Sequence, residues 1–186
     1  MIRHSASNFS AVGFAALAIL AALWASPASA LTAQARAQVM HGSDCKSTAA
    51  NADVRFDANG TRNDSADTGA FVICPLMLQY ADSEFPPIKG LAAVFFSLDG
   101  AAHDISCTAV VGAANRTPLR YSTRTVRTLP STTNHAKIQW FTGDFGGDPD
   151  VPRPIPGSAF VTVTCNLPPK TLLNYLIAGY RLDFGA

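Results

Sequence analysis

The chain has 186 residues, with 14 basic and 13 acidic side chains and a formal net charge of +1. This near balance excludes the strongly basic surface of a nucleic-acid-binding domain. The length allows one domain with a sizeable core. The many Thr, Val, Phe, Gly and Pro residues favour strands joined by turns over helices.

The N-terminus is typical of a secretory signal peptide. Arg3 and His4 precede an apolar run over 11–25, and Ala28-Ser29-Ala30 forms a small-residue cleavage site. An uncleaved membrane anchor needs about 20 apolar residues and leaves the cleavage site unexplained. We therefore expect residues 1–30 to be a signal peptide and 31–186 to be a single domain, exported to the periplasm or secreted. Loss of Arg3 with the leader leaves 13 basic and 13 acidic residues, and no later stretch is apolar enough to span a membrane.

Short stretches of alternating polarity recur through the rest of the chain, separated by Gly, Pro, Asp and Asn. Residues 31–40 show no clear pattern and receive no assignment. Asp99-Gly100 is a two-residue turn signal, which predicts that the strands on either side form a hairpin. Gly179 predicts a bulge or a close backbone approach, and one helical turn over 172–177 is the alternative there. The expected strands are 54–56, 70–78, 91–98, 105–111, 121–129, 138–142, 159–168 and 176–184. This pattern predicts an all-β, antiparallel two-sheet sandwich, Ig-like or jelly-roll-like, with seven or eight strands.

Three of the expected strands carry a cysteine in the same frame, with apolar residues two positions before and after it. Those positions share one face of a strand, so Cys74, Cys107 and Cys165 should all point into one interior. With Cys45, the even number in an exported chain predicts two disulfides, for which three pairings exist. We favour Cys45 with Cys74 and Cys107 with Cys165, because the second bond would join two core strands.

The three cysteine frames, Val-x-Cys-Pro-Leu at 72–76, Ile-x-Cys at 105–107 and Val-x-Cys-x-Leu-Pro at 163–168, also carry a resemblance. With the signal peptide, Cys45 and the Tyr180-Arg181 pair, the chain resembles a group of exported bacterial β-rich proteins that have four cysteines and no assigned activity. The resemblance covers most of the mature chain. It implies a disulfide-bonded β-domain and supplies no catalytic residue.

No motif of an enzyme is present. The sequence lacks the G-x-S-x-G and H-E-x-x-H patterns of serine hydrolases and metalloproteases, and no cofactor is expected. We therefore expect a non-catalytic binding or surface-interaction module with a glycan or protein partner. The alternative is a hydrolase whose site assembles from His103, Asp104 and a loop serine.

A long loop over 143–157 is the first candidate ligand surface. Trp140 and Phe141 precede it, and Asp144, Asp148 and Asp150 lie in it. The aromatic rings would offer a flat surface for a sugar ring or a partner chain, and the carboxylates are Ca²⁺-type ligands. The spacing fails the EF-hand pattern, so a solvated turn is preferred and no metal is expected. A buried Trp140 beside a simple connecting loop is the competing interpretation.

Two arginines form the second candidate. Arg120 and Arg124 share one strand face with Ser122, whereas Arg127 lies on the other. Arginines in a row would bind an anionic sugar or lipid headgroup. The alternative is a strand face whose charge prevents edge-to-edge pairing.

Overall fold

The structure is a computed structural model, and it describes residues 34–49, 53–76, 88–113, 117–146 and 160–182. The chain divides into two units, Met1–Leu31 and Thr32–Ala186. The first unit lies outside the described residues, so the signal peptide stays a prediction. Within the described ranges, no helix has the length and hydrophobicity needed to cross a membrane.

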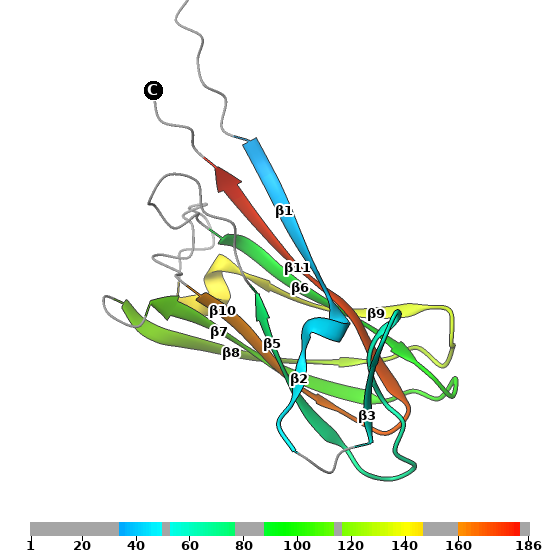
Figure 1. The fold of residues 1–186 in the computed structure, drawn as a ribbon. Coiled ribbons are helices and arrows are strands. Elements are labelled where there is room, and N and C mark those ends of the chain that lie inside the picture. Colours follow the sequence, from blue (N-terminus) through cyan, green and yellow to red (C-terminus); the bar gives the residue numbers. More distant parts are fainter. Residues whose placement is uncertain (1–33, 50–52, 77–87, 114–116, 147–159, 183–186) are drawn as a thin grey trace, which may run out of the picture. The chain divides into compact units, whose positions relative to one another are not determined.

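The second unit consists of two antiparallel sheets, as Figure 1 shows. The six-stranded sheet has the order β3-β4-β11-β6-β9, with β1 also paired to β11, and the five-stranded sheet has the order β2-β5-β10-β7-β8. The strands are β1 Gln34–His41, β2 Lys46–Ser47, β3 Val54–Asp57, β4 Gly60–Asn63, β5 Ala70–Leu76, β6 Ile88–Ser97, β7 Asp104–Ala113, β8 Thr117–Arg127, β9 His135–Phe141, β10 Phe160–Leu167 and β11 Thr171–Leu182. Two single-turn 3-10 helices, η1 Gly42–Asp44 and η2 Thr142–Phe145, follow β1 and β9.

Alternating polarity determines which side of each strand is buried. In β5 every second residue is buried from Ala70 to Leu76, and β9 alternates in the same way. The buried side chains of both sheets form a single core, in which Trp140 and Phe95 are the largest fully buried residues. The predicted all-β two-sheet sandwich is therefore confirmed. The described residues contain eleven strands, because β1, β2 and β4 add to the eight expected.

Both disulfides have the favoured pairing. Cys45 joins Cys74, and Cys107 joins Cys165. Cys107 and Cys165 are register partners on the adjacent strands β7 and β10, with Cα atoms 4.1 Å apart. All three strand cysteines are buried, as their shared frame predicts. Two bonds of this kind fit an oxidising compartment.

The predicted hairpin across Asp99-Gly100 is wrong. β6 pairs with β9 and β11, whereas β7 pairs with β8 and β10, so the connection passes from one sheet to the other. The turn is held by Asp99, whose carboxylate accepts hydrogen bonds from the Ser97 hydroxyl and the Ala101 amide and lies 2.8 Å from His103 Nε2. A turn signal shows where the chain reverses but does not show which strand it then joins.

The two terminal strands of the unit pair with each other. β1 lies antiparallel to β11 from Gln34 opposite Leu182 to His41 opposite Tyr175. β11 is one long strand with register shifts at Leu173/Tyr175 and at Gly179/Tyr180, so the irregularity predicted at Gly179 is confirmed and the helical turn over 172–177 is wrong. β1 carried no strand signal, because its side chains are mostly Ala, Gln and Arg and its pairing partner lies more than 130 residues away.

Candidate functional site

The outward face of the five-stranded sheet is the first candidate site. Four of its strands each present three consecutive outward residues to solvent, and none of these side chains is charged. We call these positions the neutral face: Phe71, Ile73 and Pro75 on β5, Thr162, Thr164 and Asn166 on β10, Ser106, Thr108 and Val110 on β7, and Tyr121, Thr123 and Thr125 on β8.

The strand register arranges these residues in three rows. The middle row runs Ile73, Thr164, Thr108, Thr123 across the four strands. The row on one side begins at Phe71 and ends at Thr125, and the row on the other side begins at Pro75 and ends at Tyr121. Five of the six positions on the two central strands thus carry hydroxyl or amide groups, and Val110 is the sixth. Thr108 Oγ1 and Thr123 Oγ1 are 2.7 Å apart and hydrogen-bonded.

Large apolar side chains lie at the two edges of the neutral face. Phe71 is 54% exposed on β5, and Tyr121 is 61% exposed on β8. Because neighbouring strands lie about 4.8 Å apart, three strand spacings separate these edges by about 14 Å. A ligand that spans both rings would cross the hydroxyl groups between them.

Charged groups border this face without entering it. Lys46 on β2 lies beside Ile73 at one edge. Asp104 and Arg127 are register partners at the ends of β7 and β8 and form an ion pair at 2.9 Å. The site is therefore electrically neutral inside a charged margin.

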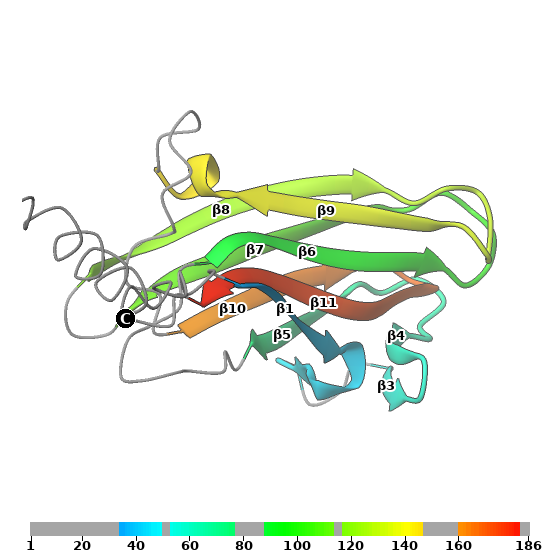
Figure 2. The same ribbon diagram turned by 90° about the horizontal axis from the view of Figure 1, so that it is seen from above.

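The structure separates the aromatic residues of the sequence-predicted ligand surface. Trp140 is fully buried, and its Nε1 donates a hydrogen bond to the main-chain oxygen of Ser122 at 3.1 Å. This contact joins β9 to β8, the last strands of the two sheets, which run beside each other in Figure 2. Phe141 is 54% exposed, but it lies on the outward side of the six-stranded sheet, away from the neutral face.

The predicted acidic and basic residues contact each other. Asp144 in η2 accepts hydrogen bonds from the Phe141 amide and from the Arg124 guanidinium. Arg120 donates a hydrogen bond to the main-chain oxygen of Phe145, the buried residue of η2. Both arginines thus fasten η2 to β8. Asp148 and Asp150, with the rest of the loop from position 147 onward, lie outside the described residues.

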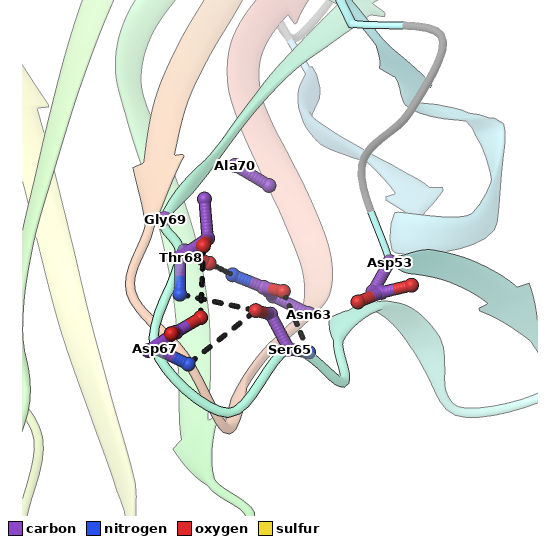
Figure 3. Close-up of a pocket in the computed structure, with 7 residues that line it drawn as sticks. All are labelled: Asp53, Asn63, Ser65, Asp67, Thr68, Gly69 and Ala70. Atoms are coloured by element: carbon purple, nitrogen blue, oxygen red, sulfur yellow. Dashed lines mark hydrogen bonds between the residues drawn. The ribbon is translucent and has the colours of Figure 1, made fainter.

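A small pocket at the turn between β4 and β5, with a volume of about 160 Å³, is lined by Asp53, Asn63, Ser65, Asp67, Thr68, Gly69 and Ala70 (Figure 3). Its buried centre is Asn63, whose amide nitrogen donates to the carbonyl oxygens of Thr68 and Leu167 and whose Oδ1 accepts from the Ser65 amide. The polar groups of Asn63 are therefore occupied in holding the turn. Among the described residues no three His, Cys, Asp or Glu side chains form a metal-binding group.

In the part of the chain that the structure describes, the two named residues of the alternative hydrolase site have other partners. His103 contacts Asp99, and Asp104 pairs with Arg127 instead. His41 Nδ1 lies 2.7 Å from the Ser43 hydroxyl, and its Nε2 lies 3.0 Å from the Ala58 oxygen. The contact between His41 and Ser43 spans two residues and caps η1, since the Ser43 amide donates to the same ring nitrogen, Nδ1. Neither the 160 Å³ pocket nor the larger one described below is lined by His41 or Ser43.

Comparison with known proteins assigns no family. No family model matches the sequence, and no curated protein matches it. Among solved structures, the family 11 carbohydrate-binding module of Clostridium thermocellum in complex with a β-1,3-1,4-mixed-linked tetrasaccharide has 11% identity and a TM-score of 0.33, over 81% of this chain and 86% of that one. A structure described as "CBM4 structure and function" has 10% identity and a TM-score of 0.31, over 78% and 86%.

The neutral face was not recognised in the sequence. Its residues are the outward half of each alternating strand, a pattern that also describes an ordinary solvated face. Only the register brings Phe71, Thr164, Thr108 and Tyr121 into one surface. A detectable signal was the lack of charge at these outward positions in 71–75, 106–110 and 162–166.

Proposed function

We propose that the mature domain is an exported glycan-binding module, and that the neutral face binds an uncharged polysaccharide. The observation that carries this proposal is the composition of the face. Hydroxyl and amide groups occupy five of its six central positions, exposed rings lie at opposite edges, and charged side chains lie only at its margin.

The chemistry of the face suits a neutral sugar chain. Threonine and serine hydroxyls both donate and accept hydrogen bonds, as sugar hydroxyls do, so either partner can satisfy the other. The apolar face of a sugar ring packs on an aromatic side chain such as Tyr121 or Phe71. A neutral ligand also avoids burying an unpaired charge, which costs much more than burying a hydrogen-bonded hydroxyl.

Export is part of the proposal. The predicted signal peptide would direct the chain to the periplasm or beyond the cell, where the two disulfides are stable and polysaccharides are accessible.

The test is retention of the purified mature protein by insoluble cellulose, chitin and xylan, with cellulose phosphate, which is charged but carries no carboxylate, as the comparison. We expect retention on at least one neutral polymer. The variants Phe71→Ala and Tyr121→Ala should each weaken that binding by up to about tenfold, because an aromatic contact contributes about 0.5 to 1.5 kcal/mol and tenfold corresponds to about 1.4 kcal/mol.

Phe141→Ala is the matched control, since Phe141 and Phe71 have the same exposed fraction on opposite faces. Loss of binding on Phe141→Ala with full binding by Phe71→Ala would assign the ligand to the surface predicted from the sequence and refute the neutral face. Equal binding to every polymer by all three variants and the parent would also refute it.

A further inference from the structure

The outward face of the six-stranded sheet contains a pocket far from the neutral face. Its volume is about 300 Å³, at the lower end of the range for small-molecule sites. The lining residues come from the hairpin β3-β4, from β11, from the end of β6 and from the loop before β9: Asn59, Arg62, Phe96, Leu98, Thr132, Leu172 and Asn174.

The floor of the pocket is one row of the sheet. Leu172 of β11 lies between Arg62 of β4 and Phe96 of β6 in the strand register, so the three side chains share the outward face. Leu172 is buried, while the Phe96 ring is partly exposed. The Phe96 ring is positioned from the other side by His135, whose ring centroid is 6.0 Å away. The row provides a flat apolar platform with a guanidinium group at one end.

The β3-β4 hairpin forms one wall of the pocket and lies close to β11. Gly60 has φ +129°, and a Cβ atom there would lie 2.2 Å from the Leu173 oxygen, so only glycine permits this approach. The Asn174 amide donates to the main-chain oxygen of Asn59 at the hairpin tip. Two amide side chains therefore border the platform, and Thr132 borders it on the opposite side.

Arg62 is the only charged residue among the described residues that line the pocket. Arg62 Nε is hydrogen-bonded to Asp64 at 2.7 Å, which fixes the guanidinium. Its Nη1 forms an ion pair with Asp57 at 3.8 Å, beyond hydrogen-bond distance, so this end of the group can still donate a hydrogen bond to another acceptor.

We propose that this pocket binds a small ring compound that carries a carboxylate, with an acidic monosaccharide as the representative ligand. The ring packs on Phe96, the carboxylate accepts hydrogen bonds from Arg62, and the amides of Asn59 and Asn174 bind ring hydroxyls. A carboxylate beside a positioned guanidinium forms the stronger, charge-assisted kind of hydrogen bond. This site is independent of the neutral face, which takes an uncharged chain.

The test is titration of the mature protein with sodium D-galacturonate and with D-galactose, followed by NMR. D-galactose has the same ring without the carboxylate. We expect galacturonate to bind at least about tenfold more tightly than galactose, because a hydrogen bond to a charged group contributes more than a neutral one. The shifted resonances should include those of Phe96 and Asn174.

Arg62→Gln should remove this preference. Arg55→Gln is the matched control, because Arg55 is the register partner of Arg62 and also pairs with Asp64, but does not line the pocket. Equal binding of the two sugars by the parent protein, or equal loss in the two variants, would overturn the proposal. Both readouts are independent of the polysaccharide assay, so either proposal can fail alone.

Discussion

Removal of the Cys107–Cys165 disulfide should cost more stability than removal of Cys45–Cys74, by an amount that the loop lengths predict. The first bond closes 58 positions and the second closes 29. The chain-entropy relation gives about 4.2 kcal/mol for the longer loop and about 3.6 kcal/mol for the shorter one. The difference, about 0.6 kcal/mol, is the value expected for one doubling of loop length.

The structure makes this comparison a clean one. All four cysteines are buried, so the Ala pairs Cys107→Ala with Cys165→Ala and Cys45→Ala with Cys74→Ala leave cavities of similar size. The contributions of those cavities nearly cancel in the difference. What remains is the freedom regained by the unfolded chain.

The assay is urea unfolding of the oxidised mature protein and of the two double variants, followed by far-UV circular dichroism. The midpoint and the slope of the free energy of unfolding against urea concentration must both be fitted. An unfolded chain without the cross-link is more expanded, exposes more surface and raises that slope. A loss below about 2 kcal/mol in both variants would refute the entropic reasoning. So would a larger loss for Cys45–Cys74, which would show that the bond acts by fastening η1 and β2 in the native state.

Three further substitutions test single contacts. Trp140→Phe keeps most of the buried volume but removes the hydrogen bond to Ser122, and should lower the free energy of unfolding by about 1 to 3 kcal/mol in a denaturant titration; an unchanged midpoint would contradict this. Asn63→Leu leaves buried main-chain groups without partners and should cost about 3 kcal/mol or more by the same measurement, whereas a neutral result would show that the turn rearranges. A hydrogen bond from His103, with others from neighbouring groups, holds the pKa of Asp99 far below its usual range. The ionised carboxylate therefore stabilises the fold at pH values above the unfolded-state pKa of about 4. This contribution is lost as the pH falls below that value. Asp99→Asn should therefore be less stable than the parent at neutral pH, with a difference that narrows between about pH 4 and pH 2 in pH-dependent unfolding; a constant difference would contradict the argument.

The sequence predicted which side of each strand is buried better than it predicted how the strands pair. The cysteine frames are one case, since a period of two residues determines the face and burial of Cys74, Cys107 and Cys165 follows. The turn at Asp99-Gly100 is the opposite case. Its local chemistry was read correctly, but the sheet that each neighbouring strand joins depends on β9, β10 and β11, which lie far along the chain.

Both candidate sites depend on the strand register, which the sequence alone does not determine. They could therefore not be predicted from the sequence. The neutral face needs four strands aligned to within one residue, because a shift by one would turn every hydroxyl inward. The pocket beside Phe96 needs a contact between Arg62 and Leu172, which are 110 positions apart. Conversely, Trp140 and Phe141 are adjacent in the sequence but point to opposite sides of β9, so no one surface contains both rings.

The position of Trp140 gives the molecule an optical reporter at one defined place. The only other tryptophan is Trp24, inside the predicted leader, so the mature chain would have a single indole. That indole is shielded from water where the last strands of the two sheets meet, and its N–H is bound to Ser122. Its emission should lie at short wavelength in the folded state and move to longer wavelength when β8 and β9 separate. Fluorescence would then follow the separation of β8 from β9, while circular dichroism follows all eleven described strands. Any offset between the two unfolding transitions would measure how independently these two strands separate.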